Sequence, residues 1–393
     1  MRRKQAGREQ LSQRVQVEEA QGAPAKPGVS LKQLLKESSR AAAKGKHGTG
    51  APDKAALHPL HVNTLKGHQG AISGVAFSAD GAALATVCED RALRIYRMDD
   101  IADPGLNFRR RNLLQTPVGV AAGDAPGQVA VLVEGRGDTA GVEMLGIGSG
   151  SGEAPAWAAA DVLRGQAPLC LCSGTGASGR GVLLAAAAKT RLAVLDARSG
   201  AVLASLDSAG LVNHGAALSA DGRLFAAATF TADVKVHEVK LNAGGDFISC
   251  AKVMDLKGHK SQVQAVAFSP DGAQAATASR DGTWCVWGLG VRHWLQEDAK
   301  KVLQAGQGLP PGACFQQLAF GPGSVVAAAA PGGELHFLDT RSGHLLEVVD
   351  AHEGDIACMQ WSPVQHRLGG SRVAVLATGA GDKRVRLWRA PRV

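Results

Sequence analysis

The sequence predicts an all-β fold, a seven-bladed β-propeller that follows a disordered basic tail. Three observations favour this fold. The 393 residues include 50 glycines but only 4% aromatic residues, which indicates many tight turns and packing by small side chains. One pattern of histidine, strand, turn, strand, aspartate and strand recurs along the chain, and its copies are separated by multiples of a near-constant interval.

The three clearest copies of the repeat span residues 65–98, 256–289 and 350–390. Each begins with a loop histidine, and an aspartate in a later turn precedes a strand that ends on an aromatic residue. The interval from aspartate to aromatic residue is six in all three copies. The interval from histidine to aspartate is 22 in the first two copies and 30 in the third, where the sequence VQHRLGGS is expected to enlarge a strand-connecting loop. These intervals are typical of the GH…WD pattern of WD40 repeats.

The number of blades follows from the histidine spacing. A fourth, weaker copy begins at His214, which is 45 residues before His259. His259 precedes His352 by 93 residues, or two repeats, and His68 precedes His214 by 146, or three repeats. Blades are therefore expected to begin near residues 68, 115, 167, 214, 259, 312 and 352, and QVAVLVEG, TRLAVLDARSG and GELHFLDTRSG represent the three degenerate ones.

Closure of the ring is expected to involve the segment before the first histidine. The last repeat supplies three strands, and LHVNTL at residues 60–65 has no blade of its own. This segment is predicted to pair with the last blade, which would remove the exposed sheet edge. The propeller is thus assigned to residues 57–393.

Residues 1–56 are predicted to be a flexible basic tail. They hold 12 lysines and arginines against five acids, so +7 of the net charge of +8 lies there. Ser30 is a candidate cap for a short helix that carries Leu31, Leu34 and Leu35, either transient or docking a partner. The candidate RNA contacts in the tail are Arg2, Arg3, Lys4, Arg8, Lys32, Lys36, Arg40, Lys44 and Lys46.

The repeated histidines and aspartates could suggest a catalytic triad, because a threonine stands four residues before each aspartate. Repetition in three blades favours a structural hydrogen-bonded network instead, since an enzyme needs one site. The predicted network comprises His68, Thr86, Asp90, His259, Thr277, Asp281, Trp287, His352, Thr378, Asp382 and Trp388. In each copy the aspartate is expected to accept a hydrogen bond from the histidine.

Other motifs for chemistry are weak. The glycine run at Gly146, Gly148, Gly150 and Gly152 is followed by Ala and Pro and is predicted to be a loop. The seven cysteines form no CxxC pair, so reduced thiols, no metal and no cofactor are expected. No apolar run is long enough to span a membrane. The chain is predicted to be non-enzymatic.

Several phrases resemble the transducin β-like protein 2 family of WD40-repeat proteins and its plant and algal relatives. They are HPLHVNTLKGH (58–68), TADVKVHEVK (231–240), MDLKGHKSQVQAVAFSPDG (254–272) and RDGTWCVW (280–287). The resemblance implies an adaptor in endoplasmic reticulum stress or translation-linked complexes, partly with RNA. It also implies an intracellular location, in the cytoplasm or at the endoplasmic reticulum. The sequence departs from the family in its lack of a hydrophobic N-terminal anchor and in His237 at an expected Trp position.

Two functional hypotheses follow. In the first, a monomeric scaffold within larger complexes binds protein partners through loops beside the marker residues. The candidate contacts are Gln69, Glu89, Arg91, Lys260, Arg280, Trp284, Glu353 and Lys383. Trp284 is favoured because interface hot spots are rich in Trp, although packing between blades is the alternative. In the second hypothesis, the basic tail binds RNA or ribosomes.

Overall fold

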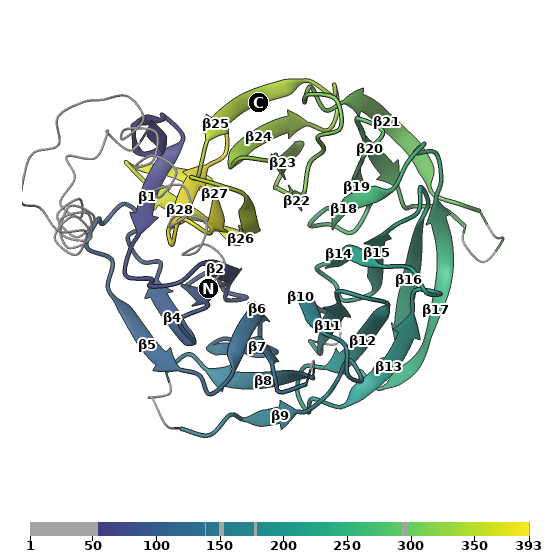
Figure 1. Ribbon diagram of the computed structural model, residues 1–393, viewed down its shortest axis with the longest axis horizontal. Coiled ribbons are helices and arrows are strands. Elements are labelled where there is room, and N and C mark those ends of the chain that lie inside the picture. The colour runs from purple at the N-terminus through teal and green to yellow at the C-terminus, as the bar shows by residue number, and fades with distance from the viewer. Residues whose placement is uncertain are drawn as a thin grey trace, which may run out of the picture. The chain divides into compact units, whose positions relative to one another are not determined.

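In the computed structural model, the described part of the chain forms seven four-stranded antiparallel sheets arranged in a ring (Figure 1). The described residues are 54–137, 139–148, 153–176, 179–292, 295 and 297–392. The predicted seven-bladed β-propeller is confirmed. The candidate RNA contacts in the tail and the predicted helix after Ser30 lie outside the described residues.

Each blade is built from consecutive strands, except the last. The first four blades are β2 (Ile72–Phe77), β3 (Ala83–Cys88), β4 (Ala92–Arg97) and β5 (Phe108–Asn112); β6 (Thr116–Ala122), β7 (Gln128–Glu134), β8 (Ala140–Gly146) and β9 (Trp157–Ala159); β10 (Pro168–Thr175), β11 (Gly181–Ala187), β12 (Arg191–Asp196) and β13 (Val202–Asp207); and β14 (Asn213–Leu218), β15 (Leu224–Thr229), β16 (Val234–Leu241) and β17 (Phe247–Leu256).

The remaining three blades include the sheet that joins the two ends of the ring. They are β18 (Val263–Phe268), β19 (Gln274–Ser279), β20 (Thr283–Gly288) and β21 (Lys300–Gly306); β22 (Gln317–Phe320), β23 (Val325–Ala329), β24 (Glu334–Asp339) and β25 (Leu345–Asp350); and β26 (Ile356–Leu368), β27 (Ser371–Ala380), β28 (Val385–Arg389) and β1 (His61–Leu65). A short 3₁₀ helix, η1 (Lys54–Leu57), precedes β1.

The seventh blade takes its outer strand from the start of the propeller sequence. β1 pairs antiparallel with β28, with Leu65 opposite Val385 and Thr64 opposite Arg386. Segments more than 300 residues apart in the sequence therefore share one sheet, and Figure 1 shows them side by side. This pairing satisfies the backbone groups along the outer edge of β28.

The core lies between neighbouring blades and is built largely from small side chains. The second strand of several blades is buried along its whole length, as in β11 (GVLLAAA), β15 (LFAAAT) and β23 (VVAAA). A strand that is covered on both faces is expected to read as a continuous apolar run. Alanine at these positions lets adjacent sheets approach closely, which agrees with the low aromatic content.

The sequence VQHRLGGS lies in a long hairpin, which corrects the expectation that it enlarges a loop. Residues 365–368 of β26 pair with residues 371–374 of β27. Gly369 and Gly370 form the two-residue turn, with φ values of 55° and 85° that favour glycine. The buried His366 bonds Ser362 Oγ at 2.8 Å, and its ring packs against Phe77 of the first blade.

The antiparallel strands divide the propeller loops between two faces. The upper face carries the loops that enter the first strand of each blade and the turns between second and third strands. The lower face carries the turns between first and second strands and those between third and fourth strands. Each candidate site can therefore be assigned to the upper or the lower face from the loops that form it.

Candidate functional site

The fifth blade contains a complete chain of hydrogen bonds on the upper face. Trp287 Nε1 donates to Thr277 Oγ1 at 2.8 Å, and Thr277 Oγ1 lies 2.7 Å from His259 Nε2. His259 Nδ1 lies 3.2 Å from Asp281 Oδ2. The carboxylate of Asp281 only accepts, so His259 Nδ1 carries the proton that is donated to it, and Nε2 accepts from the threonine hydroxyl. The chain joins the loop before β18 to the β19–β20 turn.

The protonation states of His259 and Asp281 do not change at neutral pH. Burial lowers the pKa of His259, so the imidazole is neutral. Burial alone would raise the pKa of Asp281, but hydrogen bonds from Thr283 and from the Lys260 amide lower it to about 2. A neutral imidazole that donates to an ionised carboxylate keeps its proton at neutral pH. The arrangement therefore ties two loops together.

The seventh blade repeats this geometry and adds a buried cation. His352 Nε2 lies 2.8 Å from Thr378 Oγ1, and His352 Nδ1 lies 3.0 Å from Asp382 Oδ2. Trp388 Nε1 donates to Thr378 Oγ1 at 2.9 Å. Arg386 Nη1 donates to Asp382 Oδ2 at 2.7 Å. Arg386 is buried, so its guanidinium and the carboxylate form an ion pair inside the blade.

The first blade departs from the expected pattern. His68 Nε2 bonds Thr86 Oγ1 at 2.9 Å, but His68 Nδ1 is buried without a hydrogen-bond partner in the described residues. Asp90 accepts from Arg94 Nη1 at 3.1 Å and from the Gln69 amide at 3.3 Å. The expectation that each aspartate accepts from its histidine is therefore wrong for Asp90. The carboxylate pairs with the buried Arg94, whose charge would otherwise be left without a partner.

The aromatic residue of the first blade also acts differently. Tyr96 Oη donates to the carbonyl of Lys66 at 3.1 Å instead of bonding the threonine. Burial and the nearby Arg94 lower the pKa of His68 to about 4. Blade five has Cys285 at the position of Arg94, since both stand four residues after the aspartate. The cysteine leaves Asp281 without an arginine partner, but an arginine at this position does not by itself remove the histidine bond, because Asp382 bonds both Arg386 and His352 in the seventh blade.

We expect the free energy of unfolding to fall with acidification in two windows. The pKa of His68 is about 4 in the folded chain against 6.5 as its ordinary value, so the unfolded state binds the proton first and stability is lost as the pH falls from 6.5 towards 4. Asp281 has an ordinary pKa of 3.8 and a pKa of about 2 in the folded chain, so further stability is lost as the pH falls from 3.8 towards 2. Urea unfolding at about pH 7 and about pH 5 measures the first. His68→Gln should reduce that pH difference, and an unchanged difference would contradict a neutral, buried His68.

Seven of the eight predicted partner contacts are exposed on the upper face. They are Gln69, Glu89, Arg91, Lys260, Arg280, Glu353 and Lys383. Trp284 is a correction: its side chain is fully buried in the core between the fifth and sixth blades, with Phe315 and Leu318. Trp284 follows the marker turn directly, but strand alternation points it into the neighbouring blade, where no partner protein contacts it.

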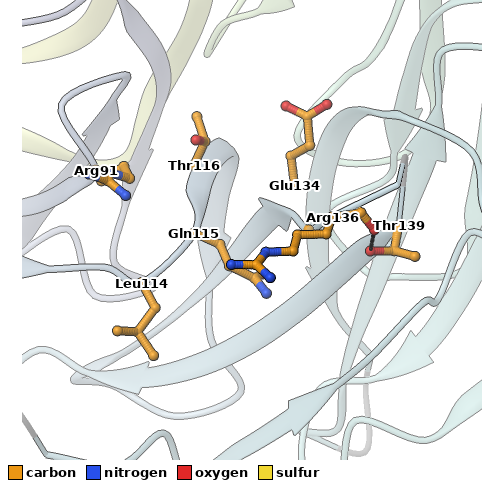
Figure 2. A pocket seen from close by; sticks show the side chains of 8 residues that line it. Arg91, Leu114, Gln115, Thr116, Glu134, Arg136 and Thr139 are labelled. Carbon is orange, nitrogen blue, oxygen red and sulfur yellow. Dashed lines mark hydrogen bonds between the residues drawn. The ribbon is translucent and has the colours of Figure 1, made fainter.

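A pocket on the upper face, between the first and second blades, was not predicted from any sequence marker. Its volume is about 530 Å³, and its lining consists of Arg91, Leu114, Gln115, Thr116, Glu134, Gly135, Arg136 and Thr139. Leu114 is 92% exposed. Figure 2 shows Arg136 extended towards Gln115, with Arg91 and Leu114 on the other side. Sequence reasoning named only Arg91, because the degenerate second blade has no marker histidine; the exposed leucine before a predicted strand was the available signal.

Three further findings bear on chemistry. Among the described residues, no group of three or more histidine, cysteine or acidic side chains is arranged to hold a metal ion. All seven cysteines are free thiols. In the described part of the chain, no helix is long and apolar enough to cross a membrane.

Comparisons with known proteins agree with the blade geometry. The family "WD domain, G-beta repeat" matches residues 60–97, 239–288 and 343–389, which include strands of the blades that carry the marker histidines. Transducin beta-like protein 2 from Homo sapiens is 28% identical over 331 residues, which cover 84% of this chain and 72% of that protein. The Mus musculus protein of the same name is 27% identical over the same length. A guanine nucleotide-binding protein subunit beta from Zea mays is 29% identical over 149 residues, or 36% of each chain. The chain is therefore a seven-bladed β-propeller that contains segments matching WD40 repeats and is similar to transducin beta-like protein 2.

Proposed function

We propose that this propeller is a non-enzymatic scaffold that binds protein partners through its upper face. The observation that carries the proposal is Leu114, which is 92% exposed beside the pocket between the first and second blades. Protein interfaces combine an apolar centre with a polar rim in which arginine is enriched. Leu114 supplies the apolar centre, and Arg91 and Arg136 supply the rim.

The two arginines are available to a partner. Arg91 and Arg136 form no ion pair within the described residues, whereas other arginines of the propeller, such as Arg94, are tied to acids. Arg91 has a positive φ of 55°, so its turn projects the side chain from a fixed backbone position. A partner residue that fills the pocket would therefore gain an apolar contact and a choice of charged hydrogen bonds.

The histidine–aspartate pairs support a structural role in place of catalysis. The side chains of His259 and His352 are completely buried, so a substrate does not reach their ring nitrogens. Each ring nitrogen already has a partner within its blade. A general base must contact the proton that it removes. The arrangement thus favours a scaffold.

The resemblance to transducin beta-like protein 2 narrows the proposal. We infer that the partners belong to complexes of the endoplasmic reticulum stress response or of translation. The alternative is RNA or ribosome association through the basic tail, which is supported by its 12 lysines and arginines against five acids. Such binding would weaken steeply with salt, because it depends on phosphate contacts.

We expect Leu114→Asp to abolish the capture of protein partners by the tagged full-length chain from cell lysate. The carboxylate would remove the apolar centre of the pocket, while folding would be unaffected because the side chain is exposed. Val302→Asp is the matched control, since Val302 is exposed on the outer strand β21. The measurement compares captured proteins with and without RNase.

The outcomes separate the two candidate functions. Partners that survive RNase, are retained by Val302→Asp and are lost with Leu114→Asp would support the upper-face scaffold. Partners that Leu114→Asp leaves unchanged would rule out this pocket. Partners that vanish with RNase and on deletion of residues 1–53 would favour the tail.

A further inference from the structure

A second, larger cavity opens on the lower face between the sixth and seventh blades. Its volume is about 1120 Å³. The β22–β23 turn and the β24–β25 turn contribute from the sixth blade, and the long β26–β27 hairpin and the residues after β28 contribute from the seventh. This cavity, called the lower groove below, is on the opposite face from the pocket of the proposed scaffold.

Four arginines line the lower groove: Arg341, Arg372, Arg389 and Arg392. No aspartate or glutamate is part of the lining, and none of the four arginines forms an ion pair within the described residues. Like charges held together raise the local positive potential and favour an anionic ligand. The groove is therefore an anion-attracting site.

Two arginines of the third blade, also on the lower face, are neutralised by acids. Arg198 of the third blade occupies the same position in DARSG as Arg341 does in DTRSG. Arg198 Nε lies 3.1 Å from Asp124 Oδ2 of the second blade, and Arg180 Nη2 lies 2.8 Å from Asp196 Oδ2. The missing acid beside Arg341 is thus a local feature of the lower groove.

Arg389 also has a buried side-chain donor that lacks a hydrogen-bond acceptor in the described residues. It is half-buried, and its Nε is buried with no hydrogen-bond partner in the described residues. Its backbone amide donates to the carbonyl of Leu60 at 2.9 Å, which fixes the backbone of this lining residue. A partly buried guanidinium without a counter-charge is stabilised when an anion binds next to it.

The remaining walls select the kind of anion. Leu60, Val325, Leu368 and Val373 line the groove, and no aromatic side chain does. Aliphatic walls accept aliphatic side chains, whereas single-stranded nucleic acid is usually held by aromatic stacking. Over residues 371–373, β27 is paired with β26 but not with β28, whose pairing begins at Val375. An extended peptide has an open strand edge there.

We propose that the lower groove binds an extended acidic segment of a partner protein. Carboxylates of the segment bond the four arginines, and its aliphatic side chains contact the leucine and valine walls. The chain's own tail is unsuitable as the occupant, because it is strongly basic. This site is independent of the upper-face pocket.

The test measures direct binding of a fluorescently labelled peptide of alternating glutamate and leucine to the full-length chain. The same peptide with glutamine in place of glutamate is the ligand control. We expect Arg341→Gln/Arg372→Gln to raise the dissociation constant about tenfold or more, since two charge-assisted contacts are lost. Arg97→Gln/Arg109→Gln is the matched control, because it removes two exposed arginines of the first blade.

Each outcome decides the proposal. Support requires that the glutamate peptide binds, that the glutamine peptide does not, and that only the groove variant weakens binding. No binding of the glutamate peptide, or equal weakening by both double variants, would overturn it. Tighter binding of polyuridylate RNA or of anionic phosphoinositide vesicles, with the same dependence on Arg341 and Arg372, would assign the groove to a different ligand. The readout needs no captured partner, so it fails independently of the scaffold proposal.

Discussion

Deletion of residues 57–65 should destabilise the entire propeller, beyond the seventh blade alone. The deletion removes β1 and leaves the outer edge of β28 without a partner. Leu60 and Leu65 are buried, and each contributes about 1.5–3 kcal/mol by burial. The two side chains alone thus supply a large part of the 5–15 kcal/mol that is typical of folded domains. Thermal unfolding should show a strongly lowered or absent cooperative transition.

Single substitutions test the same closure without shortening the chain. Leu65→Ala should cost about 2–5 kcal/mol, because it leaves a cavity beside Val385 and Val375 in a packed core. Leu57→Ala is the matched control, since Leu57 is 72% exposed, and it should leave the free energy of unfolding almost unchanged. Equal unfolding curves for the deleted and intact chains would refute closure by β1.

Replacement of Asp90 by alanine should cost about 3–5 kcal/mol, because it leaves the buried Arg94 without its carboxylate. Asp281→Ala should cost only about 1.5–3 kcal/mol, because its histidine partner is neutral and no arginine stands at Cys285. The two aspartates occupy the same position in their blades, so the comparison sets a buried arginine partner against a neutral histidine partner. Chemical denaturation of both variants measures it.

A second substitution separates two effects of losing Asp90, the unpaired charge of Arg94 and the loss of the turn that Asp90 stabilises. Asp90→Ala/Arg94→Met should recover much of the stability lost in Asp90→Ala, because an apolar side chain needs no counter-charge. If the single variants at Asp90 and Asp281 lose equal stability, or if the double variant recovers nothing, the ion pair of Asp90 with Arg94 does not stabilise the first blade.

Much of the fold could be predicted from local pattern. The histidine-to-histidine intervals gave the positions of the blades, and first strands begin at Thr116, Pro168 and Gln317 in the three degenerate blades. Strand alternation and turn residues are determined by a few neighbouring residues, so they can be recognised in the sequence of any single blade. The network in the fifth and seventh blades has the residues that the repeat predicts, within hydrogen-bonding distance.

Other features depended on residues from different blades. Trp284 follows a marker turn in the sequence, but the facing surface of the sixth blade covers it. Within the first blade, Asp90 bonds Arg94 and the Gln69 amide and not His68, an exchange of partners that the repeat pattern did not reveal. The upper-face pocket arises where the first and second blades meet, and the second blade has no marker residues at all.

The sequence by itself determined the repeat, the number of blades and the basic character of residues 1–56, because each of these is set by local spacing or composition. Only the tertiary structure decided which charges meet. Arg341 lies 51 residues before Arg392, yet both line the acid-free lower groove, while the equivalent Arg198 meets Asp124 of another blade. The physical reason is that electrostatic interaction depends on distance in space and on burial. Both quantities are set when neighbouring blades pack side by side.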